Sequence, residues 1–433
     1  LIAETSGKNA LVVTPRADLD LAVADLVKSA FGHAGQKCSA ASLAIVVGSV
    51  GTSERFRRQL VDAVESLKVG HPDDPEVTMG PVIEPPRGKL LSGLTELGPD
   101  ETWLVQPRRL HDDDRLWTPG VRDGVRPGSE FHTTEYFGPV LGIMHASSLE
   151  EAIEWQNATD YGLTAGIHSL DPDEVNQWID TVEAGNLYVN RGITGAIVQR
   201  QPFGGWKRSS VGTSCKAGGP NFLTHLGTWE SRPLRRPADP SILQPAITAM
   251  LEAARPHLSA SELDDLTAAA TSDEIAWQRE FGINKDVSGL GVERNVFRYR
   301  PTAVSIRAED VPLRDVVRVL LAGTRAGAPL QVSTAAPLPD GLVDASLVTV
   351  EGREAWWTRI GTERPARIRL VGPGAREAAE AVQGDPDVAI HAGVVTQAGR
   401  LEVLPFLLEQ SVTITQHRFG NPDPSFARVL PRR

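Results

Sequence analysis

Short runs of β-branched and aliphatic residues alternate with helical patterns along this chain of 433 residues. Residues 42–48 (SLAIVVG) have the composition of a buried strand. Residues 18–35 and 53–70, on either side, place apolar residues at helical spacing, and Asp18 offers a capping side chain for the first helix. Strands and helices that alternate in this way predict an α/β fold built in layers.

The composition changes near residues 230–245, where proline and arginine cluster in SRPLRRPADPS. Because no periodicity continues through this segment, we expect a domain boundary there. Beyond it, LRDVVRVLLAGTRAG precedes PLQVS, and RIRLVG precedes AREAAEAV, VAIH and VTITQ. This alternation predicts a second layered α/β domain. The predicted units are residues 1–205, a connecting segment over 206–244 and a C-terminal domain over 245–433.

Composition and charge argue against several classes of protein. The formal net charge of −11 disfavours non-specific binding of nucleic acid, which depends on basic side chains. Two cysteines provide no disulfide framework, so we expect a reducing compartment, the cytoplasm. The sequence contains no signal-peptide pattern and no apolar run near the ~18–20 residues that span a bilayer. It opens within what reads as a buried strand, so we expect further chain upstream of Leu1.

Cys38 lies in FGHAGQKCSAAS, where Gly35 and small residues follow a predicted helix. A turn of this kind can expose a thiol and let a substrate approach closely. The thiolate is the nucleophilic form of cysteine, so its environment must lower the pKa or supply a base. The alternative is a buried, unreactive cysteine, which is the commoner situation for a free thiol.

Glu4, in AETSGKNA, precedes Cys38, in GQKCSA, by 34 positions. Three more motifs follow in order: EYFGPVLGI (135–143), NATDYGLTAGIHS (157–169) and QPFGGWKRSSVG (201–212). Together, at this spacing, they resemble the aldehyde dehydrogenase superfamily over about residues 1–230. The resemblance implies that residues 1–205 form most of a catalytic domain and that residues 206–244 carry an interface strand and a linker.

The resemblance also implies a division of roles. Cys38 attacks the aldehyde, and its own backbone N–H stabilises the developing oxyanion. Glu4 activates the water that hydrolyses the resulting thioester. Glu135 and Phe137 hold the nicotinamide end of NAD, while the adenosine site and the choice between NAD and NADP belong upstream of Leu1. The alternatives are a solvated surface acid for either glutamate and plain core packing for Phe137.

Two segments resemble the L-glutamate-γ-semialdehyde dehydrogenase branch, also called Δ1-pyrroline-5-carboxylate dehydrogenase: NRGITGAIVQRQPFGGW (190–206) and KAGGPNFL (216–223). The implied substrate is L-glutamate γ-semialdehyde, whose carboxylate would meet the backbone N–H groups of Gly195 and Ala196. The Ser39 hydroxyl would contact the substrate, and Phe203 would pack on its aliphatic part. The alternatives are an ordinary turn glycine at Gly195 and a helix cap at Ser39.

Three C-terminal segments resemble the extra domain of long, bifunctional proline utilization A proteins: RNVFRYRP (294–301), VLLAGTRAGAPLQVS (319–333) and SVTITQHRFGNP (411–422). The resemblance implies a degenerate dinucleotide-binding fold with a structural role, a homo-oligomer, and an FAD-dependent proline dehydrogenase upstream. Any association with a membrane would then depend on that upstream part. The G-x-G pattern of VGPGAREAAEA (371–381) lacks a third glycine and is a weak signal for nucleotide binding.

Two other functions stay open at this point: another branch of aldehyde dehydrogenases, or a non-catalytic fragment with the same fold. Intact Cys38, Glu4 and Glu135 favour an enzyme, although we expect weak NAD binding without the upstream half. No cluster of His and Cys has zinc-like spacing, so we expect no metal site. Cys215 matches no catalytic position of the family, and we expect a structural role for it. His33 stands five residues before Cys38, but we expect no Cys–His dyad, because the resemblance implies a glutamate as the base.

Overall fold

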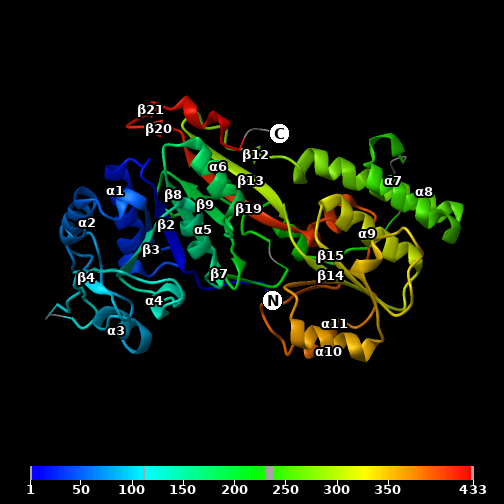
Figure 1. Cartoon of the computed structure of the whole chain (residues 1–433), viewed down its shortest axis with the longest axis horizontal. Helices are drawn as coiled ribbons and strands as arrows, with labels where there is room; N and C mark the ends of the chain where they lie inside the picture. Colours follow the sequence, from blue (N-terminus) through cyan, green and yellow to red (C-terminus); the bar gives the residue numbers. More distant parts are fainter. Residues whose placement is uncertain (1, 111–112, 214, 231, 233–237, 431–433) are drawn as a thin grey trace.

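The computed structural model describes residues 2–110, 113–213, 215–230, 232 and 238–430 (Figure 1). Two β-sheets with helices packed against them form its framework, so the prediction of an α/β fold is confirmed. Residues 231 and 233–237, inside the predicted boundary segment, lie outside the described residues.

The larger sheet contains the apolar runs of the first half of the chain. Its central strands are parallel neighbours, and antiparallel pairs form both edges. From edge to edge the strands are β12 (Lys285–Asp286), β13 (Glu293–Pro301), β19 (Leu407–Thr415), β9 (Asn186–Val189), β8 (Thr164–His168), β2 (Asn9–Val13), β3 (Ala41–Val47), β6 (Val140–Ala146), β5 (Gly120–Asp123) and β4 (Thr102–Val105). The central strands β2 and β3 are mostly aliphatic because helices bury both of their faces.

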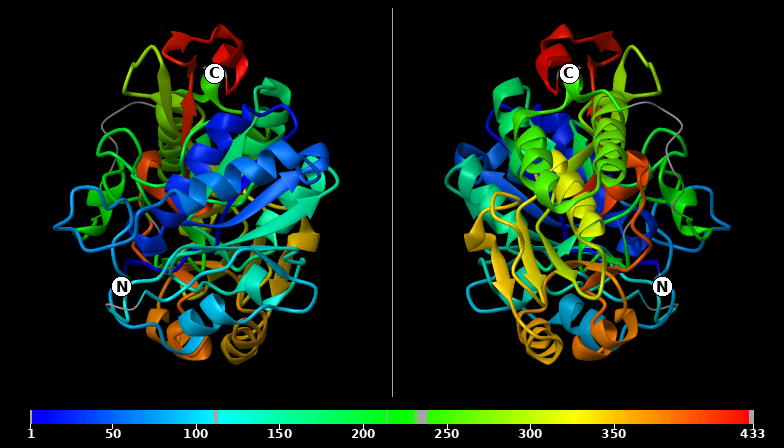
Figure 2. Two further views of the ribbon diagram at one scale, coloured as in Figure 1. Left: turned by 90° about the vertical axis from the view of Figure 1, so that its left-hand side faces the viewer. Right: turned by 90° about the vertical axis from the view of Figure 1, so that its right-hand side faces the viewer.

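Helices cover the two faces of this sheet because side chains alternate along each strand (Figures 1 and 2). Side chains of α1 and α2 pack on the face that carries Leu11 and Val46. Side chains of α5 and α6 pack on the face that carries Val12 and Ile45. The helices of this half are α1 (Leu19–Phe31), α2 (Glu54–Glu65), α3 (Gly88–Thr95), α4 (Glu130–Thr133), α5 (Leu149–Asn157) and α6 (Pro172–Thr181).

The second sheet is entirely parallel and belongs to the C-terminal part. Its order is β16 (Val348–Val350), β15 (Leu330–Thr334), β14 (Val304–Ala308), β17 (Arg367–Val371) and β18 (Ala389–His391). Numbered along the chain, this is the 3-2-1-4-5 arrangement of dinucleotide-binding folds, as the resemblance implied. The helices of this part are α7 (Pro245–Ala254), α8 (Ala260–Ala276), α9 (Leu313–Ala326), α10 (Arg353–Glu363), α11 (Ala375–Ala381) and α12 (Gly399–Glu402).

The two sheets do not divide at the predicted boundary between residues 244 and 245. Strands β12, β13 and β19 come from the C-terminal part, yet they extend the larger sheet. β19 lies parallel to β9, with Ser411 opposite Asn186. The VTITQ segment, which we expected in the second domain, therefore lies in the first sheet, because its backbone hydrogen-bonds the edge of β9.

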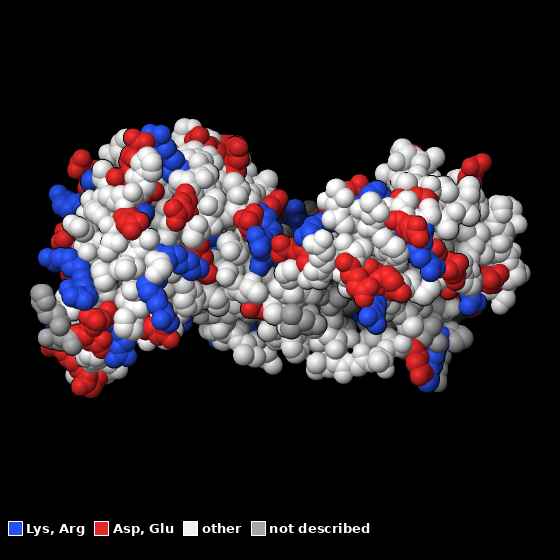
Figure 3. Space-filling view, turned by 90° about the horizontal axis from the view of Figure 1, so that it is seen from below, with Lys and Arg blue, Asp and Glu red and all other residues white. Residues whose placement is uncertain are grey.

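Charged side chains are mixed over the molecular surface. Figure 3 shows acidic and basic residues interspersed on one face, without a continuous basic region. No described helix combines the length and the apolar character needed to cross a membrane.

Candidate active site

Three loops with the predicted chemistry lie at the amino ends of central strands of the larger sheet. Glu4 lies in the short strand β1 (Ala3–Glu4), just before β2, and Cys38 lies just before β3. Glu135 and Phe137 lie just before β6. Because β2, β3 and β6 are parallel neighbours, their amino ends lie side by side. The sheet therefore brings together the predicted nucleophile, base and cofactor residues.

A tight turn places Cys38. Residues 33–35 all adopt the left-handed backbone conformation, with φ between 53° and 67°. Gly35 is required in this turn, because a Cβ atom there would lie 2.2 Å from the carbonyl oxygen of Gly138. The turn before Cys38 thus packs directly on the loop that carries Phe137, whose own φ of 57° is also left-handed.

Asn9 and Gly7 fix the backbone of Cys38. The Asn9 Nδ2 atom donates hydrogen bonds to the carbonyl oxygens of Cys38 (2.7 Å) and Ala40 (2.9 Å). A Cβ atom at Gly7 would lie 2.8 Å from the Cys38 oxygen, so only glycine fits there. The Gly7 N–H donates to Glu135 Oε1 at 3.0 Å, which joins the nucleophile loop to the cofactor loop through one residue.

The thiol of Cys38 is exposed, which agrees with a nucleophile and not with a buried cysteine. Partial burial and the negative charges of Glu135 and Glu4 raise the pKa of Cys38. Both carboxylates therefore lie close enough to act electrostatically on the sulfur. Cys215 is buried, and burial raises the pKa of its thiol to about 12.

A backbone hydrogen bond holds the carboxylate of Glu4 against Gly205. Its Oε2 accepts a hydrogen bond from Gly205 N–H at 2.8 Å, and the Ser210 hydroxyl also donates to it. Burial raises the pKa of Glu4 to about 7, although the Gly205 hydrogen bond and the charge of Lys216 act to lower it. A carboxyl group with a pKa near neutrality is suited to take a proton from water and release it again.

Glu135 and Phe137 present polar and apolar surfaces beside the thiol. Glu135 is half-buried and uses Oε1 to accept from Gly7, while Phe137 has 36% of its surface exposed. Gln36 fixes this loop, because its Nε2 donates to the Phe137 carbonyl oxygen at 3.2 Å. A carboxylate and an exposed ring in this position fit a ribose hydroxyl and the face of a nicotinamide riboside.

The four predicted substrate residues differ in their exposure to solvent. Ser39 follows the exposed thiol but is buried, at 5% exposure. Gly195 and Ala196 are exposed in the loop after β9, and Gly195 has a φ of 85° with open space where a Cβ would be. Phe203 is half-buried and forms a two-way backbone bridge with Ala217. These four roles stay predictions, and the exposed Gly195–Ala196 backbone is accessible to an anion.

Several contributing residues were not predicted from the sequence. Gly7 and Asn9 hold Cys38 through contacts across neighbouring strands, and Lys216 faces Glu4 from the KAGG segment. Gly7 and Asn9 belong to the same motif as Glu4, AETSGKNA, and this position could have indicated a role at the site. For Lys216, the signal was a charged residue inside an otherwise apolar, glycine-rich segment.

The weak G-x-G signal lies where the chain packs closely against the residue that follows β14. A Cβ atom at Gly372 would lie 2.3 Å from the carbonyl oxygen of Glu309, which follows β14. The Glu309 carboxylate itself pairs with Arg307 (2.9 Å) and Arg353 (3.0 Å). Ligands of such sheets bind at the carboxyl ends of the two central strands, and here ion pairs occupy that place.

We expect iodoacetamide to modify Cys38 of the native chain well before Cys215, because only the first thiol is exposed. The rate should keep rising above pH 9.0, the ordinary value, because the pKa of Cys38 is raised and the thiolate is the reactive form. Timed labelling followed by peptide mass spectrometry measures both. Cys215→Ala is the control and should leave the fast phase intact; labelling of Cys215 first would contradict the structure.

Residues 1–229 of the chain match the aldehyde dehydrogenase family. The 1-pyrroline-5-carboxylate dehydrogenase of Bacillus licheniformis is 40% identical over 224 residues, 52% of this chain and 43% of the relative. The enzyme of the same name from Bacillus subtilis is 38% identical over 224 residues, with the same shares. The solved structure of proline utilization A (PutA) from Corynebacterium freiburgense is 48% identical, with a TM-score of 0.79, and the match covers 97% of this chain and 40% of that one.

The chain thus spans less than half the length of these relatives. The family match covers more than half of this chain and includes Glu4, Cys38, Glu135 and Phe137. The chain belongs to the aldehyde dehydrogenase family.

Proposed function

We propose that the chain catalyses the NAD-dependent oxidation of L-glutamate γ-semialdehyde to L-glutamate, a step of proline degradation. The observation that carries this proposal is the exposed Cys38 thiol at the amino ends of the central strands, where Glu4 and Glu135 also lie. The names of the relatives support the substrate, because hydrolysis of the cyclic imine of 1-pyrroline-5-carboxylate yields this aldehyde.

The residues of this chain define the protein's part in the reaction. The Cys38 thiolate adds to the aldehyde carbon and forms a thiohemiacetal oxyanion, which the Cys38 N–H can stabilise. Loss of hydride from that carbon leaves a thioester on Cys38. Glu4, with a pKa of about 7, takes a proton from the water that attacks the thioester. Cleavage then releases the carboxylate product and the free thiol.

The cofactor loop fits a nicotinamide riboside. Glu135 uses Oε1 for Gly7 and leaves Oε2 for a ribose hydroxyl, and Phe137 offers an exposed ring. When bound, NAD supplies the hydride acceptor. The adenosine half of the site belongs to the part of the relatives that this chain does not span.

We also propose that the active protein is a homo-oligomer in the cytoplasm and that it works together with a proline dehydrogenase. Two free thiols among the described residues suit a reducing compartment. The similarity to PutA over nearly the whole chain supports the link to proline. Within residues 206–244, β10 (Trp206–Lys207) pairs with β7, and β11 (Ser210–Val211) pairs with β1. We propose that an interface strand of the oligomer also lies in this segment.

Gly195→Ala tests the carboxylate anchor. We expect kcat/KM for L-glutamate γ-semialdehyde to fall roughly tenfold, because a methyl group shields N–H donors that would bind a charged group. Oxidation of butanal, which has no carboxylate, should stay unchanged. The assay uses a protein that supplies the missing part of the relatives, with NADH absorbance as the signal.

Gly327→Ala is the matched control, since Gly327 also has positive φ (67°) and open space around it, but lies at the end of α9. Equal losses for both aldehydes would argue against an anchor at Gly195. Equal kcat/KM values for the two aldehydes in the unaltered enzyme would contradict the proposed substrate but not the aldehyde dehydrogenase activity.

A further inference from the structure

A buried carboxylate from the C-terminal part reaches the neighbourhood of Glu4. Glu409, near the amino end of β19, is 6% exposed. Its Oε2 accepts a hydrogen bond from the backbone N–H of Lys216 at 2.6 Å, and Asn221 Nδ2 donates to its Oε1. Its carbonyl oxygen accepts from the indole N–H of Trp206 at 2.8 Å. Glu409 thus contacts Trp206, which directly follows Gly205, the residue bonded to Glu4, and also Lys216 further along the chain.

The charge of Lys216 acts on both carboxylates. Its side chain is buried, and its Nζ atom donates to Asn186 Oδ1 at 2.9 Å and to the carbonyl oxygen of Gly204. A Cβ atom at Gly204 would lie 2.8 Å from Glu4 Oε1 and 3.3 Å from the Lys216 Cα atom, so Glu4 and Lys216 flank the same glycine.

Glu4, Lys216 and Glu409 line one small cavity. Its volume is about 10 Å³, which is room for about one water molecule. Lys216 and Glu409 are buried, while Glu4 lies at the surface end of this space, and the charges of all three side chains act on one another. Two of the three belong to the region of the family match, and Glu409 lies outside it.

We propose that Glu409 is a positioning residue for the base: it keeps Lys216 charged and in place, and Lys216 in turn keeps Glu4 ionised on Gly205. The proposal rests on the proposed function, because it assumes that Glu4 activates the hydrolytic water. It assigns the C-terminal part an effect on catalysis in addition to its packing.

Burial raises the pKa of Glu409, whereas its hydrogen bonds from Lys216 N–H and Asn221 and the charge of Lys216 act to keep it ionised. Burial lowers the pKa of Lys216 to about 8, and the charge of Glu409 opposes that fall more strongly than the charge of Glu4 does. The charge of Lys216 lowers the pKa of Glu4. Loss of the Glu409 charge therefore favours neutral Lys216, and neutral Lys216 favours protonated Glu4. The charge of Arg400 also lowers the pKa of Glu409. The charge of Glu409 in turn raises the pKa values of Cys215, Tyr299 and Arg367.

Glu409→Gln tests the proposal because it removes the charge and keeps the shape and a hydrogen-bond acceptor. The probe is p-nitrophenyl acetate, which acylates Cys38 with release of p-nitrophenolate and needs no NAD. Water then hydrolyses the acetyl thioester, and the rate of this second phase reports on Glu4. In the unaltered chain this rate should fall as the pH drops through about 7, where Glu4 takes up a proton. In Glu409→Gln the fall should occur about one pH unit higher.

Three further variants separate a charge effect from a structural one. Glu409→Asp restores the charge and should bring the profile back toward the unaltered one. Lys216→Met should shift the profile in the same direction as Glu409→Gln, and it provides a second measurement if that variant does not fold. Glu274→Gln is the matched control, since Glu274 is buried and ion-paired to Arg325 in the same C-terminal part. Its profile should match that of the unaltered chain.

The outcomes are distinguishable. Unshifted profiles in Glu409→Gln and Lys216→Met, with a normal burst of p-nitrophenolate, would overturn the role of Glu409 and leave the proposed function standing. Absence of a Cys38-dependent burst in the unaltered chain would contradict the proposed function itself. A shift in Glu274→Gln as large as in Glu409→Gln would show a general loss of structure and would also overturn the proposal.

Discussion

Cys38→Ala is expected to reduce kcat/KM for aldehyde oxidation by roughly 10⁴-fold or more, because no other exposed thiol among the described residues can form the thiohemiacetal. Fold and stability should stay nearly unchanged, since the side chain is exposed and the loop is held by backbone contacts of Cys38. The measurement compares NADH formation with the circular dichroism of the same samples, in a protein that supplies the missing part of the relatives.

Cys215→Ala is the control for this experiment. Cys215 is buried, and its thiol has a pKa of about 12, so its removal should leave oxidation intact. Undiminished turnover in Cys38→Ala would show that Cys38 is not the nucleophile and would contradict the proposed mechanism. Equal losses in both variants would point to damage of the fold.

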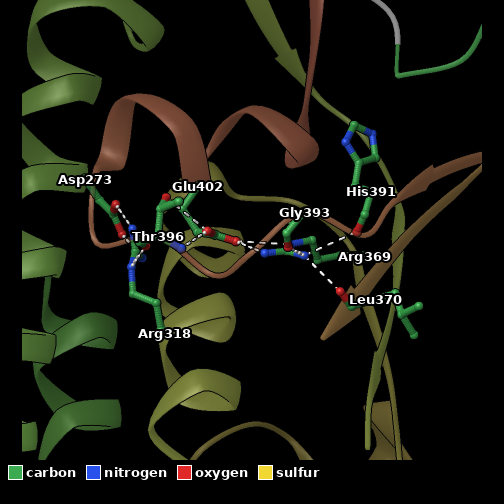
Figure 4. A network of polar contacts seen from close by, with 8 residues as sticks. All are labelled: Asp273, Arg318, Arg369, Leu370, His391, Gly393, Thr396 and Glu402. Atoms are coloured by element: carbon green, nitrogen blue, oxygen red, sulfur yellow. Dashed lines mark hydrogen bonds and ion pairs between the residues drawn. The ribbon is translucent and has the colours of Figure 1, made fainter. Parts of the chain in front are cut away.

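Asp273→Ala is expected to lower the free energy of unfolding of the C-terminal part by about 3–5 kcal/mol, because it leaves the Arg318 guanidinium buried without its partner. The two side chains are 1% and 3% exposed, and both carboxylate oxygens accept hydrogen bonds from Arg318, at 2.7 and 2.8 Å. Figure 4 shows that the network continues beyond this pair. Arg318 Nε donates to the Thr396 carbonyl oxygen at 2.8 Å, and Thr396 N–H donates to Glu402 at 2.7 Å.

Urea unfolding of single and double variants measures this effect. Asp273→Leu combined with Arg318→Met should be nearly neutral, because an apolar pair of similar size avoids the cost of burying two charges. Glu380→Ala, which breaks the exposed Arg376–Glu380 pair, should cost at most about 1 kcal/mol. A loss of unfolding free energy in Asp273→Ala as small as that in Glu380→Ala would contradict a stabilising buried ion pair.

Local features of the first half followed well from the sequence. The predicted helix after Asp18 is α1, and the Asp18 carboxylate accepts from Leu21 N–H as an N-cap should. The helix predicted from residue 53 begins after Ser53, whose hydroxyl accepts from Phe56 N–H. Such elements depend on residues within a few positions of one another, so the sequence contains their signals.

Long-range features were not predictable in the same way. The contact of Asn9 with Cys38, and that of Lys216 with Glu409 at a separation of 193 positions, depend on which strands become neighbours. The motif resemblance indicated that Glu4, Cys38 and Glu135 work together, but not that the amino ends of β2, β3 and β6 unite them. The short helix α3 and the strand β4 were missed, because they are brief and lie beside a proline-rich loop.

The position of β19 has a consequence for any attempt to isolate the catalytic half. A polypeptide that stopped at the 233–237 segment would retain every catalytic motif, but β9 would become an open sheet edge. The backbone groups of Asn186–Val189 that now face β19 would lose their partners, and an unprotected edge of this kind recruits strands from other molecules. We therefore expect a chain cut where its composition changes to aggregate instead of yielding a smaller soluble enzyme.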